Sequence, residues 1–219
     1  MPEPAAPAQA LILRRLMLPR AVGGRLPGTV AVVGNAPVPA SAERAERIDA
    51  ADLVVRMTTF ALDDDEPAIG RRTDVVVLHR AVAPGPDTFR DHARRLYLLA
   101  EPGRGWWEDE RLPPWWPRDL ELVPISNREF TSRTRAAMGL APGSIAWPTT
   151  GTLAVHLVRG LFPHARILLA GSSLLARPGG QGFDHRWGAR VRLTPEHRLA
   201  REARALRRWT REGWLEVLP

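Results

Sequence analysis

Short runs of apolar residues, each ending in a polar or glycine-containing turn, recur along the chain. The run at 29–33 ends in Gly34-Asn35, and similar runs occupy 52–57 and 74–79. Runs of this length without alternating polar positions are typical of strands buried on both faces of a parallel sheet. The same pattern predicts further strands at 96–99, 120–124, 165–171 and, as a sheet edge, 214–218.

Capping residues that precede apolar positions at helical spacing lie between these runs and predict helices. The helices predicted are 43–48 after Ser41, 87–95, 127–138 after Ser126 or Asn127, 152–161 after Thr149-Thr150, and 195–211 after Thr194. Pro195 at the first position supports the last of them, and Gly213 marks its end. Because strands alternate with helices, we predict one α/β domain at 28–219, with a mainly parallel sheet flanked by helices.

Residues 1–27 are expected to form an N-terminal tail and helix outside this domain. The apolar run at 10–18 carries Arg14, Arg15 and Arg20 on its polar side, so it could lie on a membrane surface as a peripheral contact or be a loosely attached helix. Its charges do not precede the apolar run, as they would in a signal peptide. No apolar stretch approaches the ~20 residues of a membrane span, and we expect a cytoplasmic location.

Composition narrows the chemistry. The 219 residues contain 31 basic and 24 acidic side chains, and since there is no lysine every basic residue except the 6 histidines is arginine. A net charge of +7 raises nucleic acid as a partner. Arginine without lysine indicates compositional bias, however, and we expect no nucleic-acid partner. The absence of cysteine excludes disulfides, thiol catalysis and thiolate metal sites.

Four tryptophans fall among three prolines at 106–117, in chain that matches neither a helix nor a strand pattern. The segment containing Trp106, Trp107, Trp115 and Trp116 is predicted to be a long loop. Aromatic rings serve both ligand binding and core covering. The loop is therefore either a lid that faces an acceptor or a cover over the core.

Three segments have the composition of anion-binding sites, and the third, at Thr194 to His197, is the start of the predicted last helix. Gly34-Asn35 follows a buried strand, where glycine permits close backbone approach and Asn can donate to a phosphate or sugar. Thr149-Thr150-Gly151 precedes an apolar helix, so its hydroxyls and free amides can cradle a phosphate. Each pattern alone is also common in purely structural turns and caps.

Two histidines stand out by their surroundings. His185 lies in a polar, glycine-rich loop at 179–188, and His197 lies in the first turn of the predicted last helix. A helix N-terminus lowers the pKa of an imidazole and so favours the neutral form that a general base requires. No histidine pair has metal-ligand spacing, so no metal site is predicted.

The order of these features resembles the sialyltransferase family of inverting glycosyltransferases (glycosyltransferase family 29). The matching segments are 33–35 (Val-Gly-Asn), 48–49 (Ile-Asp), 56–57 (Arg-Met), 70–75 (Gly-Arg-Arg-Thr-Asp-Val), 148–151 (Pro-Thr-Thr-Gly), 184–187 (Asp-His-Arg-Trp), and His197 with Glu202. The resemblance spans about residues 28–213. It is nearest to short soluble bacterial members, some labelled urease operon accessory protein.

The resemblance implies a Rossmann-like, GT-A-variant-like fold. It also implies metal-independent, inverting transfer of sialic acid or a related ulosonic sugar. The CMP-sugar donor is a substrate, the acceptor is a glycan or small-molecule hydroxyl, and no cofactor is expected. In the large motif, Gly34 and Asn35 would contact the ribose or phosphate of CMP, and Arg56 and Thr58 would also lie at the donor.

The remaining motifs supply the other half of the implied site. Thr149, Thr150 and Gly151 would hold the cytidine or phosphate through hydroxyls and amides. His185 would stabilise the departing phosphate, and His197 would deprotonate the acceptor. Glu202, five residues after His197, would not share its helix face, so we interpret it as an orienting, structural carboxylate.

Departures from the family pattern leave alternatives open. Thr58 stands where the family has Asn, the cysteine pair of the animal enzymes is absent, and no Golgi anchor is expected. A catalytically degenerate CMP-binding or accessory protein would bind CMP without releasing it from any CMP-sugar. A generic nucleotide-binding enzyme is disfavoured because neither G-x-G-x-x-G nor G-x4-G-K-[ST] occurs. Binding that falls steeply with salt would reveal a nucleic-acid binder.

Overall fold

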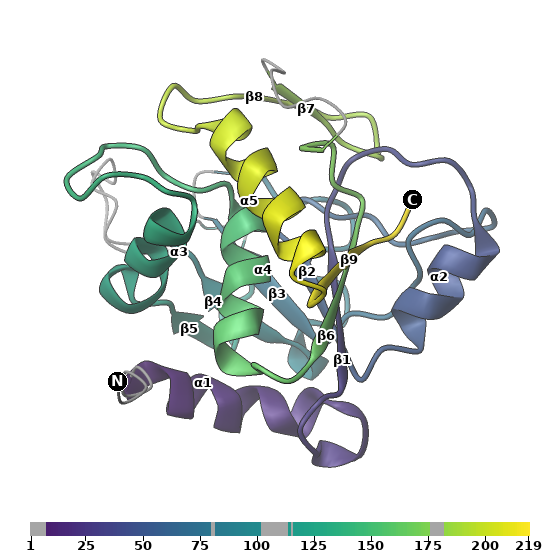
Figure 1. The fold of residues 1–219 in the computed structure, drawn as a ribbon. Helices are drawn as coiled ribbons and strands as arrows, with labels where there is room; N and C mark the ends of the chain where they lie inside the picture. Colours follow the sequence, from purple (N-terminus) through teal and green to yellow (C-terminus); the bar gives the residue numbers. More distant parts are fainter. Residues whose placement is uncertain (1–7, 80–81, 102–113, 115, 176–181) are drawn as a thin grey trace.

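The computed structural model describes residues 8–79, 82–101, 114, 116–175 and 182–219. Seven strands form one sheet in the order β5-β4-β3-β2-β1-β6-β9, and every neighbouring pair is parallel (Figure 1). Their bounds are β1 Thr29–Val33, β2 Leu53–Met57, β3 Val75–Leu78, β4 Leu96–Leu99, β5 Leu122–Pro124, β6 Arg166–Ala170 and β9 Leu215–Val217. Each predicted apolar run is a strand, and the α/β fold class is confirmed.

Helices cover both faces of the sheet. One face packs against α1 Ala8–Met17, α3 Ser132–Ala137, α4 Thr150–Leu161 and α5 Leu199–Arg211. The other face packs against α2 Ala42–Asp49 and the loops (Figure 1). The remaining elements are η1 Leu18–Arg20, η2 Val22–Gly24, η3 His92–Arg94, the π-helical η4 Asn127–Thr131, and the antiparallel pair β7 Gly182–Asp184 and β8 Arg190–Arg192.

Strand β1 shows why the apolar runs are continuous. Successive side chains of a strand point to opposite faces. Val30 and Val32 belong to the core under α4, whereas Ala31 and Val33 belong to the core under α2. All four are fully buried, so neither face of β1 is in contact with water.

The N-terminal helix α1 is packed more firmly than expected. Leu13 and Met17 are fully buried in the same core as α4, and the Arg14 guanidinium donates to the carbonyl of Leu161. The expectation of a loosely attached helix is therefore wrong for this segment. Its outer side carries Leu11 and Ile12, which are more than half exposed, and peripheral membrane contact stays a prediction. No helix among the described residues is long and apolar enough to cross a membrane.

The predicted helix at 87–95 is wrong, since these residues form turns and a single 3-10 turn. The side chain of Asp87 accepts the backbone N–H of Leu62 instead of capping a helix. The Thr88 hydroxyl donates to the carbonyl of Thr58, and Asp91 has a left-handed φ of 52°. Contacts with a distant loop therefore override the local pattern.

Two further predictions near the C-terminus are corrected. Helix α5 begins at Leu199, its N-cap residue is Arg198, and neither Thr194 nor Pro195 is helical. The segment at 179–188 is not simply a loop, because β7 lies within it and pairs with β8; residues 179–181 lie outside the described chain. The β7–β8 pair stands above the main sheet, next to the N-terminal end of α5 (Figure 1).

Candidate functional site

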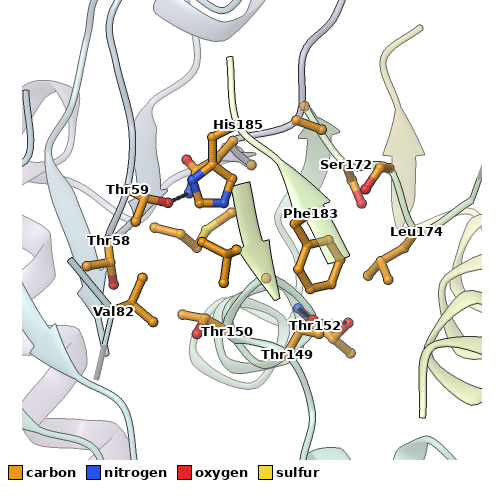
Figure 2. A pocket seen from close by; sticks show the side chains of 18 of the residues that line it. Thr58, Thr59, Val82, Thr149, Thr150, Thr152, Ser172, Leu174, Phe183 and His185 are labelled. Atoms are coloured by element: carbon orange, nitrogen blue, oxygen red, sulfur yellow. Dashed lines mark hydrogen bonds between the residues drawn. The ribbon is translucent and has the colours of Figure 1, made fainter. Parts of the chain in front are cut away.

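The strand order places a crevice at the carboxyl ends of β1 and β6. The chain runs from β1 outward to β5, and β6 then returns to the opposite side of β1. Such a reversal is the usual ligand site of an open parallel sheet. A cavity of about 290 Å³ lies there (Figure 2). Of the predicted site residues, those that line it are Gly34, Asn35, Thr58, Thr149, Thr150, Gly151, His185 and His197.

Gly34 is required by a close approach of two backbones. A Cβ at Gly34 would lie 2.2 Å from the carbonyl oxygen of Gly171, and a Cβ at Gly171 would lie 2.6 Å from that of Gly34. Gly171 also has a left-handed φ of 60°, which favours glycine. The glycine after β1 was predicted to admit a ligand, but its steric reason is this contact with the end of β6.

Asn35 presents one free polar atom to the cavity. Its amide nitrogen donates to the Thr59 hydroxyl, while its Oδ1 is buried and makes no hydrogen bond to a described residue. A primary amide can exchange the places of N and O by rotation. Asn35 can therefore either donate to or accept from a ligand.

Thr58 is less available. Its hydroxyl accepts the backbone N–H of His79 at 2.7 Å and lies 3.4 Å from the carbonyl oxygen of Val77, to which it can donate. The residue is 4% exposed. The hydroxyl proton of Thr58 is thus used within the protein, and the Thr58 side chain mainly forms part of the cavity wall.

A buried carboxylate binds the first residues of α4 beside the cavity. Glu202 on α5 accepts from the Thr149 amide at 3.1 Å, from the Thr149 hydroxyl at 2.6 Å and from the Thr152 hydroxyl. Thr149 in turn accepts the amide of Thr152 as N-cap. The interpretation of Glu202 as an orienting carboxylate agrees with these contacts. Thr150 and Gly151 line the cavity immediately after the cap, and the first amides of a helix have no partner within the helix.

Glu202 is fully buried. Burial raises the pKa of its carboxyl, and the hydrogen bonds from Thr149 and Thr152 oppose that rise. The carboxylate therefore joins α5 to the N-terminus of α4. This long-range contact could not be found from spacing alone, because it joins positions 50 residues apart.

His185 lies on the cavity wall with its ring free. The residue is 8% exposed, its Nδ1 is buried without a hydrogen bond to a described residue, and Trp187 lies against it with ring centroids 6.3 Å apart. Burial lowers the pKa of His185, with a smaller opposite effect from Asp184. At neutral pH the ring is neutral, with one N–H to offer an acceptor.

His197 is held in place by contacts with Trp147 and not by a helix. It forms an isolated parallel bridge with Trp147, and its Nδ1 lies 2.9 Å from the carbonyl oxygen of Trp147. Since a carbonyl only accepts, Nδ1 carries the proton and the neutral ring keeps a lone pair on Nε2. The predicted help from a helix dipole does not apply, because α5 starts two residues later. The hydrogen bond to Trp147, which fixes the tautomer of the ring, prepares His197 to accept a proton instead.

Arg56 does not line the cavity. It is fully buried, and its guanidinium donates to the carbonyls of Arg72, Ile69 and Gly70. Burial lowers its pKa to about 10, so it stays charged at neutral pH. Arg56 points away from the site because its neighbour Met57 takes the cavity side of β2. Its predicted place at the donor is corrected to a structural one.

Sequence reasoning missed His79, which also lines the cavity. Its Nε2 lies 3.4 Å from the carboxylate of Glu101, whose side chain is 4% exposed. Both follow the carboxyl ends of neighbouring strands, β3 and β4. That position is the signal that could have found them.

The tryptophan loop is described only in part. Trp106, Trp107 and Trp115 lie outside the described residues. Trp116 is 5% exposed and packs against Phe89 with ring centroids 6.0 Å apart. This ring covers the core, which agrees with one of the two interpretations of the loop.

Among the described residues, no group of three or more histidine, cysteine or carboxylate side chains has the geometry of a metal site. The cavity instead combines three kinds of group: helix N-terminal amides that favour an anion, a neutral histidine able to donate, and a histidine whose Nε2 can take a proton. Such a set can bind a phosphate and deprotonate a hydroxyl in the same space.

Comparisons with known proteins agree with this architecture. A mammalian sialyltransferase superposes with a TM-score of 0.60 at 17% identity, covering 99% of this chain and 81% of that enzyme. A mammalian sialyltransferase in complex with Gal-β-1-3GalNAc-ortho-nitrophenol superposes with a TM-score of 0.58 at 17% identity, covering 95% and 79%. No family model and no curated protein matches the sequence. The chain therefore has a sialyltransferase-like fold.

Proposed function

We propose that this protein is a metal-independent, inverting glycosyltransferase that transfers sialic acid or a related ulosonic sugar from a CMP-sugar to an acceptor hydroxyl. The observation that carries the proposal is the meeting of the α4 N-terminus, His185 and His197 in one cavity. The sialyltransferase-like fold supports the donor class. The acceptor bound in one structural neighbour, Gal-β-1-3GalNAc-ortho-nitrophenol, makes that disaccharide a reasonable first acceptor to test.

In this proposal the phosphate of the donor lies at the N-terminus of α4. The amides of Thr150 and Gly151 donate to it, and the helix dipole favours its negative charge. Asn35 lies after the neighbouring strand β1, within reach of the ribose or the phosphate. Gly151 has room for the nucleotide because a Cβ there would meet only Met57, at 3.8 Å.

His197 acts as the general base. Its Nε2 lone pair, held ready by the bond from Nδ1 to Trp147, takes the proton of the acceptor hydroxyl. The acceptor oxygen then forms a bond to the anomeric carbon while the bond from that carbon to the phosphate oxygen breaks on the opposite face. The attack is a single displacement, so the configuration inverts.

His185 stabilises the leaving group. As the bond to the phosphate breaks, negative charge grows on CMP, and a hydrogen bond from the neutral His185 ring strengthens with it. Because Nδ1 of His185 has no hydrogen bond to a described residue, no protein hydrogen bond from that atom is lost when the ring donates to the phosphate. A charge-stabilising donor and helix amides together provide what a metal ion supplies in other transferases.

Calorimetry with CMP in EDTA tests the nucleotide site. We expect binding of CMP without added metal, and weaker binding of UMP and GMP at the same concentration. A folded protein that shows no heat with CMP, or that binds CMP only after metal is added, would contradict the proposal. A thermal-shift panel of CMP, CDP, UDP and GDP serves as an independent check.

A second candidate is a CMP-binding accessory protein without transfer activity. The specific observation in its favour is Thr58, whose hydroxyl proton is used by the protein, at a position where the related family has a donor-contacting Asn. Such a protein would bind CMP but release none from CMP-sialic acid. Quantifying CMP release with and without Gal-β-1-3GalNAc separates the two candidates.

A further inference from the structure

The position of His185 is determined by its neighbours in sequence. Its ring has no hydrogen bond to a described residue, but the residues that follow are anchored to the opposite wall of the cavity. The amide of Arg186 donates to the carbonyl of Asn35 at 2.8 Å, and the indole N–H of Trp187 donates to the carbonyl of Thr59 at 2.8 Å. The 185–187 segment thus bridges from β7 to the ends of β1 and β2.

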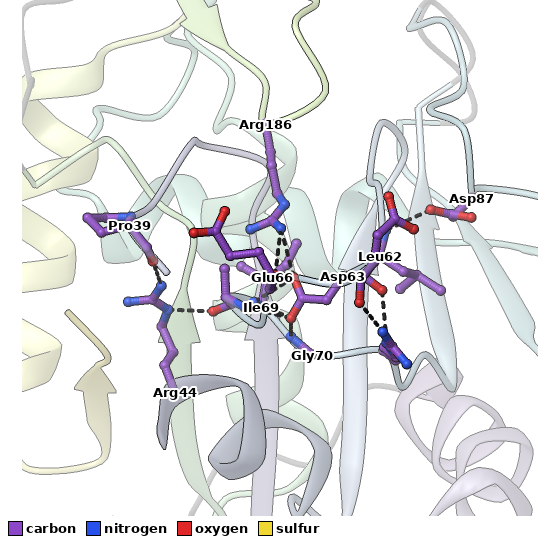
Figure 3. A network of polar contacts seen from close by, with 12 residues as sticks. Pro39, Arg44, Leu62, Asp63, Glu66, Ile69, Gly70, Asp87 and Arg186 are labelled. Carbon is purple, nitrogen blue, oxygen red and sulfur yellow. Dashed lines mark hydrogen bonds and ion pairs between the residues drawn. The ribbon is translucent and has the colours of Figure 1, made fainter. Parts of the chain in front are cut away.

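The side chain of Arg186 supplies a third anchor (Figure 3). Its guanidinium forms an ion pair with Asp63 at 3.1 Å and lies 3.3 Å from the carbonyl oxygen of Glu66. The side chain of Arg186 is 21% exposed and that of Asp63 is 3% exposed. A pair so shielded from water is weakened little by salt. This contact joins residues more than 100 positions apart and was not evident from the sequence.

Asp63 is itself rigidly held. Its carboxylate accepts three consecutive backbone N–H groups, from Ala68, Ile69 and Gly70, at 2.6 to 3.1 Å. The same loop is bound from the other side by Arg44, which donates to the carbonyls of Ala68 and Pro39 (Figure 3). The carboxylate that receives Arg186 is therefore a fixed point, so the ion pair limits where the His185 segment can move.

We propose that Arg186 is a positioning residue that holds His185 against the departing phosphate through its ion pair with Asp63. This inference rests on the proposed function for its kinetic part, but its structural part does not. A group that must donate only as charge develops loses effectiveness when it is displaced by about 1 Å. Loss of the anchor should therefore impair turnover more than donor binding.

The test compares three variants in the full chain. Arg186→Met removes the charge and keeps the aliphatic length, and Arg186→Lys retains a cation that can still reach Asp63. Arg190→Met is the matched control, because Arg190 lies on the adjacent strand β8, with its side chain 74% exposed, and pairs loosely with Asp184 at 3.6 Å. Hydrogen exchange of residues 185–188 reports the anchor without any ligand, and CMP release from CMP-sialic acid reports kcat and KM.

We expect Arg186→Met to accelerate exchange at 185–188 and to lower kcat about tenfold or more, with KM for the donor changed less than about threefold. Arg186→Lys should recover most of the kcat, and Arg190→Met should match the wild type in both measurements. Unchanged exchange and kcat in Arg186→Met, or a change confined to KM or to thermal stability, would overturn the proposal. A wild type without CMP release refutes the proposed function, and the exchange data still decide the anchor.

Discussion

Because His156 is buried in its neutral form, we expect the protein to lose stability steeply in mild acid. His156 lies on α4 outside the cavity, with its ring stacked on Trp209 at a centroid distance of 5.4 Å. The Thr134 hydroxyl donates to the carbonyl of Phe130, so the 3.0 Å contact between Thr134 and His156 is a donation from the Nδ1 proton of the histidine. Burial lowers the pKa of His156 to about 4, assisted by the charges of Arg133 and Arg208.

The magnitude follows from proton linkage. An unfolded histidine has a pKa of about 6.5, so below that pH the unfolded chain binds a proton that folded His156 refuses. The full contribution is present above pH ~6.5 and is lost as pH falls towards the folded pKa near 4. A gap of about 2.5 units at about 1.36 kcal/mol per unit gives about 3 kcal/mol across this window.

Urea unfolding at several pH values between 7.5 and 4.5 measures this slope. His156→Asn is the informative variant because its amide can still donate to Thr134 but does not titrate. Its absolute stability should be lower at pH 7.5, while its stability should fall with pH more shallowly than that of the wild type by up to about 1.4 kcal/mol per pH unit. Parallel curves for the two proteins would refute the assignment of His156 as a buried neutral group.

Three further predictions concern other parts of the molecule. Gly151→Ala should leave thermal stability equal or higher, because a Cβ there meets only Met57 at 3.8 Å and Ala favours helix by up to about 1 kcal/mol. The affinity for CMP measured by calorimetry should fall about tenfold. An unchanged affinity would show that Gly151 is not part of the site. Glu202→Ala should lower the free energy of unfolding by about 3 kcal/mol, because the buried Thr149 amide loses its acceptor. The exposed control Glu212→Ala should lower it by less than about 0.5 kcal/mol, and equal losses in the two variants would contradict the role of Glu202. Leu11 and Ile12 are exposed on α1 next to the exposed Arg15, which predicts salt-sensitive co-sedimentation with anionic vesicles. Equal recovery with neutral vesicles, or no recovery at all, would count against membrane contact.

Local signals in the sequence were sufficient for the sheet and for most of the cavity. Buried parallel strands leave continuous apolar runs, as at β1, and Ser41 and Thr149 cap their helices as predicted. The strand ends meet at one edge of a parallel sheet, so motifs far apart in sequence come together there. This is why Gly34 and Gly151 share a cavity although neither position was conclusive alone.

Long-range contacts account for what the sequence did not reveal. The start of α5 moved to Leu199 because His197 pairs with Trp147 in a bridge. The approach of Gly34 to Gly171, and the pairing of Arg186 with Asp63, depend on partners that no local pattern identifies. Arg56 was misplaced for a related reason, since a motif match does not say which face of β2 a side chain takes.

In the proposed mechanism, His197 takes the acceptor proton during transfer from a CMP-sugar. The most direct measurement is the rate of CMP release from CMP-sialic acid in the presence of an acceptor glycan and EDTA. The wild type and His197→Ala are compared with each enzyme saturated to the same degree with CMP-sialic acid. Loss of a general base predicts a decrease of about 10² to 10⁴-fold in the variant, with CMP affinity unchanged. Release of CMP by the variant at the wild-type rate would show that His197 is not the base.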